Sequence, residues 1–230
     1  MHSPDDIWYA IANTTVLLSP QRRLETFGHT VINYHLISEK MDSANETRVR
    51  EGRVHAEKPQ VLTPAYFENL LLEGFGKEAE QYVDWLRIHI KDLAFLKYGI
   101  RFRKEESRES TFSEKPDVIG ARVKSWVEER GEPLTAVIMG VDDAWEICLL
   151  KFVTDLIRKA MPEHVEDLRN RKLLGNVSGI PRAVLEEIEE DFRRVKDVSS
   201  MKALGAKLRS YGIFEQFEDR FYSLVRRVAR

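Results

Sequence analysis

The chain contains a single cysteine, Cys148, among its 230 residues. One thiol cannot form a disulfide within the chain, and it excludes zinc and iron–sulfur sites built from several cysteines. Cys148 also lies in a strongly apolar segment, where burial would raise the pKa of the thiol and make it a poor nucleophile. A disulfide scaffold is therefore excluded, and the sequence does not favour Cys148 as a nucleophile.

Long apolar runs are missing as well. The most apolar stretch, residues 134–157, is interrupted by five charged side chains, whereas a membrane-spanning helix needs about 20 apolar residues in succession. The first ten residues, MHSPDDIWYA, show no basic segment followed by an apolar run, so they do not read as a secretion signal. We expect a cytoplasmic protein that does not enter a membrane.

Neither sign of charge dominates. The chain has 36 Lys and Arg against 38 Asp and Glu, and 43% of its residues are hydrophobic. This balance excludes a disordered polyelectrolyte and a generally basic coat for nucleic acid.

One polar segment, residues 105–115, is typical of an exposed connection because it is rich in Ser and Glu. We therefore expect an α+β domain at 1–104, the connection at 105–115 and a helical domain at 116–230, or one continuous domain with the same order of elements.

The first half mixes two periodicities. Residues 7–18 are rich in β-branched and aromatic side chains and predict strand structure, and alternation predicts further strands at 30–38, 48–55 and 98–105. Two helices are expected at 63–74 and 77–97. This half should form a small antiparallel or mixed sheet with two helices.

The second half is mostly helical. Apolar periodicity predicts helices at 116–130, 143–161, 163–173, 181–196, 199–211 and from 214 onward, with one short strand at 134–139. The helix at 143–161 is apolar nearly all round, which is typical of the centre of a bundle. The predicted fold class is α+β, with a helical bundle in the C-terminal half.

The most informative pattern for function is cationic. Residues 87–104 contain six Lys and Arg side chains against one acid, a net charge of +5. If the strands share one sheet, its polar face would combine arginines with Asn and His, and guanidinium groups suit phosphate and carboxylate oxygens. The predicted ligand-binding residues are Asn33, His35, Arg50, Arg101 and Arg103.

These residues support a non-catalytic binding or regulatory protein whose ligand is an anionic small molecule, such as a nucleotide, or the phosphates of a nucleic acid. An alternative is an enzyme that acts on a phosphorylated or nucleotide substrate, with His35 as the acid/base. A third interpretation is structural: a solvated sheet face with cross-strand pairs to Glu51 and Glu105.

Other motifs lack their context. The segment Gly74–Ala79 matches Gly-x-Gly-x-x-Ala, but the expected helix before it is not the strand that a dinucleotide site requires. The six histidines include no pair at the four-residue spacing of a helical zinc site. We therefore expect no metal and no cofactor.

The C-terminal helix carries an aromatic stripe of Phe214, Phe217 and Phe221. Such a stripe can bind a protein partner in a structural or assembly subunit, or simply pack in the core. A homo-oligomer is compatible with either interpretation.

Overall fold

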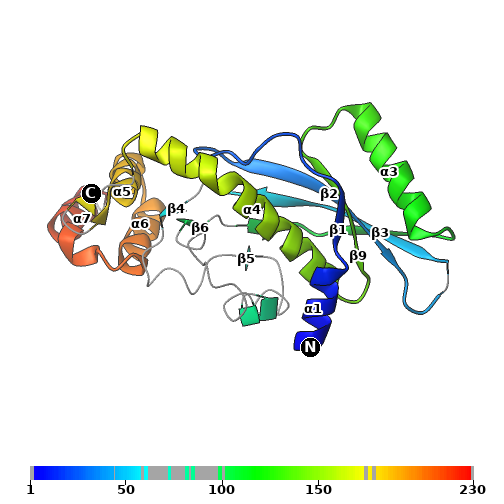
Figure 1. Cartoon of the computed structure of the whole chain (residues 1–230). Coiled ribbons are helices and arrows are strands. Elements are labelled where there is room, and N and C mark those ends of the chain that lie inside the picture. Colours follow the sequence, from blue (N-terminus) through cyan, green and yellow to red (C-terminus); the bar gives the residue numbers. More distant parts are fainter. Residues whose placement is uncertain are drawn as a thin grey trace. The chain divides into compact units, whose positions relative to one another are not determined.

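The computed structural model describes residues 3–43, 45–57, 60–61, 72–73, 81–82, 84–85, 98–99, 102–173, 176–177 and 180–228. The chain divides into two compact units. Figure 1 colours the chain by residue number, from blue at the N-terminus to red at the C-terminus. The first comprises Met1–Lys58, Leu71–Phe95 and Ile100–Pro162. The second comprises Pro59–Leu70, Leu96–Gly99 and Glu163–Arg230. The fold is α+β, as the sequence predicts.

A mixed sheet of seven strands organises the described part of the first unit. The parallel pairs are β2 with β9 and β5 with β7, and the other pairs are antiparallel. The strands follow the order β1 (Thr15–Leu18), β9 (Thr135–Val141), β2 (Thr30–Glu39), β3 (Thr47–Ala56), β7 (Phe102–Lys104) and β5 (Leu72–Glu73), and β8 (Arg108–Phe112) also pairs with β3. The predicted strands at 30–38 and 48–55 are confirmed.

The register between β2 and β3 decides which side chains share a face. His35 lies opposite Glu51, and Leu36 lies opposite Arg50. Because side chains alternate along a strand, His35 and Glu51 project to one face, and Leu36 and Arg50 to the other. We call these the histidine face and the arginine face.

Helix α3 (Pro116–Arg130) packs on part of the histidine face. Ile37 and Val137 of the sheet form one apolar cluster with Ile119 and Val127 of the helix. The helix ends at Gly131, whose left-handed conformation (φ 62°) is the one in which glycine has no steric penalty.

The arginine face is covered by α1 (Pro4–Ala12) and the first part of α4 (Trp145–Asn170). Leu36 and Ile138 of the sheet belong to the same core as Ala10 of α1 and Leu150 of α4. The prediction that residues 143–161 lie at the centre of a bundle is therefore wrong. This helix is apolar nearly all round because the sheet and α1 both pack against it.

The expected strand at residues 7–18 begins as a helix. Ser3 caps α1: its hydroxyl accepts from the Asp6 amide at 3.2 Å, and the Asp6 side chain accepts from the Ser3 amide at 2.7 Å. This reciprocal pair, with Pro4 in the first turn, starts a helix despite the β-branched composition.

The segment expected to be an exposed connection contains β8, and all five residues of that strand are exposed. Its backbone nevertheless pairs with β3. Helix α3 and strand β9, which follow, lie in the first compact unit with the sheet.

The second unit contains three helices that pack around one core in the described residues: α5 (Arg182–Arg194), α6 (Val198–Ser210) and α7 (Phe214–Val228). Two short antiparallel pairs accompany them: β4 (Gln60–Val61) with β6 (Tyr98–Gly99), and β10 (Asn176–Val177) with β11 (Ile180–Pro181). The helix expected at 163–173 is not separate, because α4 continues through Pro162.

The helix expected at 63–74 lies outside the described residues except for Leu72–Glu73, where the prediction is wrong because these two residues form β5 and pair with β7. Of the helix expected at 77–97, residues 81–82 and 84–85 are described, and they are helical. None of the helices in the described ranges is both long enough and apolar enough to cross a membrane.

Candidate functional site

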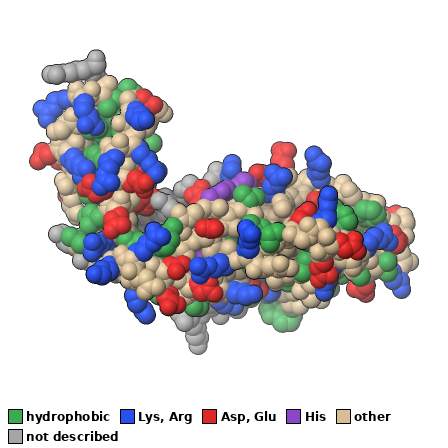
Figure 2. Space-filling view, turned by 90° about the horizontal axis from the view of Figure 1, so that it is seen from above, with side chains coloured by type: hydrophobic (Ala, Val, Ile, Leu, Met, Phe, Trp, Pro, Cys, Tyr) green, Lys and Arg blue, Asp and Glu red, His purple; other side chains and the backbone are tan. Residues whose placement is uncertain are grey.

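The histidine face is apolar where α3 packs against it and polar around His55. Its polar part carries five side chains that we call the histidine–arginine cluster: His29, Arg53, His55, Arg103 and Glu105. The register places Arg103 opposite His55, and the Glu105 amide donates to the Arg53 carbonyl at 3.0 Å. Figure 2 shows histidine side chains exposed together at the surface, beside basic and acidic ones.

Two imidazoles and a carboxylate form a hydrogen-bonded chain in this cluster. His55 Nε2 bonds the Glu105 carboxylate, and His55 Nδ1 lies 3.1 Å from His29 Nε2. The rings of His29 and His55 are stacked with centroids 5.0 Å apart. An ionised Glu105 accepts from Nε2–H, so Nδ1 of a neutral His55 accepts from His29. Both ring nitrogens of His55 therefore have a partner, which fixes the orientation of the ring.

The same cluster is rich in positive charge. The pKa of Glu105 is held below its ordinary value of 4.5, first by the hydrogen bond from His55 and also by the charges of His55, Arg53 and Arg103. Both arginines are exposed, and neither forms a direct ion pair within the residues that the structure describes. The charges of two guanidinium groups thus act on the Glu105 carboxylate.

The lowered pKa of Glu105 predicts how the cluster responds to acid. An unfolded chain protonates this group near pH 4.5, before the folded chain does. Its contribution to stability is therefore present above that pH and is lost as the pH falls through the folded pKa. We expect Glu105→Gln to reduce the loss of unfolding free energy between about pH 6 and pH 3, measured by urea denaturation.

The matched control for this acid response is Glu218→Gln, an exposed position on α7 outside the cluster. It should retain the wild-type difference between the two pH values. An equal difference in wild type and Glu105→Gln would show that the His55 contact does not stabilise the fold.

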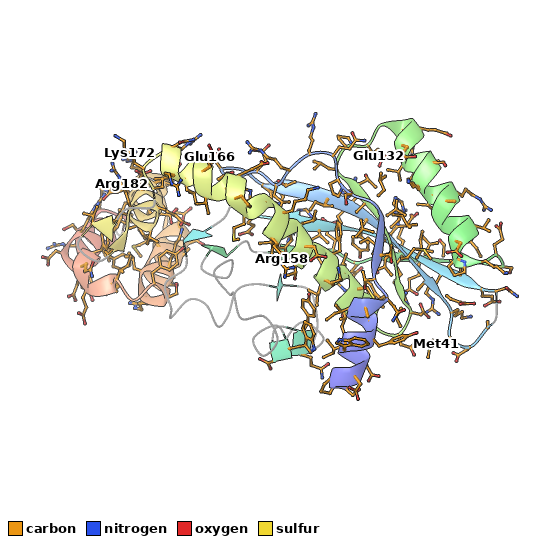
Figure 3. The ribbon with its side chains drawn as sticks, in the orientation of Figure 1. Met41, Glu132, Arg158, Glu166, Lys172 and Arg182 are labelled. Carbon is orange, nitrogen blue, oxygen red and sulfur yellow. The ribbon has the colours of Figure 1, made fainter. Side chains whose placement is uncertain are left out.

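Asn33 and His35 lie on the same face as the cluster, but each already contacts a neighbouring side chain. Asn33 Nδ2 reaches the Thr135 hydroxyl at 3.5 Å, and that hydroxyl donates at 3.0 Å to Glu132, which Figure 3 labels just beyond α3. His35 is buried: its Nδ1 lies 3.1 Å from Glu51, and its ring meets Trp126 edge-on with centroids 5.7 Å apart.

The placement of His35 weakens the enzymatic alternative in which this residue is the acid/base. The ring is covered by Trp126 and held by Glu51, so it is not presented to a substrate beside the arginines. The cross-strand pairs expected for a structural face, to Glu51 and Glu105, are both present, but the partners are His35 and His55.

Arg50 does not belong to this face. It lies on the arginine face, 3% exposed, where its Nη1 donates to Asp142 at 2.8 Å and to the Ser38 hydroxyl at 3.1 Å. Its Nε donates to Glu109 at 2.8 Å. The prediction that Arg50 joins Asn33 and His35 at one site is wrong, because the register separates them by a face.

The network around Arg50 is a neutral, paired cluster. Asp142, 4% exposed, also accepts from the Ser38 hydroxyl at 2.8 Å and from Arg48 at 3.0 Å. The guanidinium of Arg50 stacks on Trp145 at 5.0 Å. Buried charges with this many partners are typical of a structural network.

Lys104 extends this network on the same indole. Its ammonium lies 4.5 Å from the Trp145 ring centroid and pairs with Glu146. Trp145 therefore holds a cation near its ring from each of two strands, β3 and β7. Each of these cations has its own carboxylate.

The remaining candidate positions are less informative. Burial raises the pKa of the Cys148 thiol, as the sequence predicts, and the Val141 amide donates to its sulfur at 3.3 Å. Among the described residues, no three His, Cys, Asp or Glu side chains are placed to hold a metal. Arg101 and the glycine motif Gly74–Ala79 lie outside the described residues.

The aromatic stripe of α7 packs within the second unit. Phe221 is 7% exposed in the core, and Phe217 meets Phe192 of α5 with ring centroids 5.9 Å apart. Phe214 lies edge-on to Phe221 at 5.4 Å. Partner binding by this stripe stays a prediction, with part of its apolar area already covered.

The sequence reasoning missed His29 and His55. The signal present in the sequence was the two-residue period, which puts residues 53 and 55 on one face of their strand and residues 103 and 105 on one face of theirs. Comparison with models of protein families, with curated proteins and with solved structures finds no match to this chain.

Proposed function

We propose that the chain is a binding protein for an anionic, phosphate-bearing small molecule, and that the histidine–arginine cluster is its site. The observation that carries the proposal is the pair of exposed guanidinium groups, Arg53 and Arg103, whose charges both act on the carboxylate of Glu105. Guanidinium forks bind phosphate oxygens in pairs. Arg50 is no part of this site.

The histidines add a ring of fixed orientation to the site. His55 is fixed by hydrogen bonds at both ring nitrogens, to Glu105 and to His29. A fixed ring loses little conformational entropy when a ligand binds beside it.

The proposal predicts the effect of removing both arginines. The double variant Arg53→Ala with Arg103→Ala should bind ATP more weakly by about tenfold or more, because each of the two substitutions removes a charged hydrogen-bond donor. Isothermal titration calorimetry at low ionic strength measures the affinity, and added salt should reduce it in the wild type.

Two further variants sharpen the calorimetric experiment. Lys196→Ala with Lys202→Ala removes the same charge from exposed positions of the second unit and should change the affinity by less than about twofold. Arg53→Lys with Arg103→Lys keeps the charge but not the fork, and should give an intermediate loss. Equal affinity in the wild type and the double alanine variant would refute the site.

A further inference from the structure

A second anion site is indicated in a different part of the chain. A pocket of about 420 Å³ lies between α5 and α7, within the second unit. We propose that this pocket binds a small organic anion, a phosphate ester that carries an aromatic or apolar body. Its lining residues are Phe192, Arg193, Arg220, Ser223, Leu224 and Arg227.

Helical spacing explains why these residues converge. Positions 220, 223, 224 and 227 follow the i, i+3, i+4, i+7 pattern of one helix face, and positions 189, 192 and 193 do the same on α5. Phe192 and Leu224 are each 5% exposed and provide an apolar base. Arginines on both helices then line the pocket above it.

The charges of the pocket are unbalanced in favour of an anion. Glu189 pairs with Arg220 through both carboxylate oxygens, with Nη2 and Oε2 2.8 Å apart, and this contact holds the pKa of Glu189 below its ordinary value. Arg193 acts on Glu189 only through its charge. Arg193 and Arg227 form no direct ion pair within the described residues, so the lining of the pocket carries three guanidinium groups and no carboxylate.

Arg220 is held in place before any ligand arrives. Glu189 fixes its guanidinium from one direction, and the ring of Phe192 lies beneath it at 4.2 Å. A cation held on an aromatic face and a buried apolar base together suit a ligand with a charged head and a planar body. The volume is also in the range of pockets that hold small organic ligands.

This site is independent of the histidine–arginine cluster, because no residue is shared and the two lie in different units. The experiment uses the full chain and 1-naphthyl phosphate, whose fluorescence reports binding. We expect saturable binding at this pocket, with 1-naphthol and inorganic phosphate each weaker there by about tenfold or more, because each offers half of the recognised chemistry.

Two double variants, one in the pocket and one in the histidine–arginine cluster, test which site binds 1-naphthyl phosphate. Arg193→Ala with Arg227→Ala should weaken 1-naphthyl phosphate by about tenfold or more, while Arg53→Ala with Arg103→Ala should change it by less than about twofold. All four positions are exposed, so neither variant should unfold the chain, which circular dichroism checks. A wild type that does not bind, or the same affinity in both double variants, would overturn the pocket assignment, whereas the sheet site is tested separately by the ATP titration of Arg53→Ala with Arg103→Ala.

Discussion

Asp142→Ala should lower the free energy of unfolding by about 3 kcal/mol or more, the cost of breaking a buried ion pair by removing one partner. The Asp142 carboxylate accepts three hydrogen bonds, from Ser38 at 2.8 Å, from Arg50 at 2.8 Å and from Arg48 at 3.0 Å. Without it, Arg50 keeps its charge at 3% exposure, and Ser38 stays fully buried. Urea denaturation of wild type and variant measures the difference.

Glu109 supplies the matched control for Asp142, because it binds the same guanidinium. Its carboxylate pairs with Arg50 Nε at 2.8 Å but remains 49% exposed. Glu109→Ala should therefore cost less than about 1 kcal/mol, since water replaces a half-exposed partner. Equal losses from Asp142→Ala and Glu109→Ala would show that burial does not set the energy of this network.

A paired replacement separates the charge from the space that it fills. Arg50→Met combined with Asp142→Leu removes both charges and keeps apolar volume, so it should recover much of the stability that Asp142→Ala loses. Arg48 loses its Asp142 contact in this double variant but is 26% exposed, so water can solvate it. A double variant as unstable as Asp142→Ala would contradict the explanation by a buried charge that has lost its buried partner.

The network around Asp142 also shows what the sequence could and could not predict. Alternation within residues 30–38 and 48–55 correctly predicted two strands. The same two-residue period puts Arg50 and Arg53 on opposite faces of one strand, so the sequence alone is enough to separate these two arginines. The period does not give the pairing register, and the register is what places Arg50 opposite Leu36 and away from His35.

Long-range partners explain the remaining errors about the site. Asp142 reads locally as part of a helix start, yet its buried partner Arg50 is 92 residues away. His55 likewise bonds Glu105 across 50 residues. The error at α1 has a local cause instead, since Ser3-Pro4-Asp5-Asp6 contains a helix-start signal that outweighs the β-branched residues after it.

Gly52→Ala should destabilise the first unit by about 1–3 kcal/mol, the range for adding a carbon to a closely packed core. A Cβ at this position would lie 2.6 Å from the Tyr34 hydroxyl oxygen and 2.8 Å from the ring carbon that carries it. Tyr34 is 1% exposed and cannot move aside freely. Gly52 is not among the glycines with positive φ, so the loss comes from the clash and not from backbone strain.

The Tyr34 hydroxyl makes this prediction testable by rescue. It is buried and meets no hydrogen-bond partner in the described residues, although Ser107 is close enough to oppose part of the rise in its pKa, which burial takes to about 12. Tyr34→Phe should therefore cost little by itself, because no hydrogen bond is lost. Combined with Gly52→Ala it removes the closest contact, so it should recover part of the lost stability.

Gly131→Ala is the matched control for the rescue. Nothing lies within 4 Å of a Cβ at that position, but its φ of 62° strains any residue with a side chain. Its cost, about 1 kcal/mol, should add to that of Tyr34→Phe without coupling. Urea denaturation of the single and double variants gives the coupling energies. A coupling of zero for Tyr34 and Gly52 would mean that the chain relieves the clash by moving β3 and not by giving room to the hydroxyl.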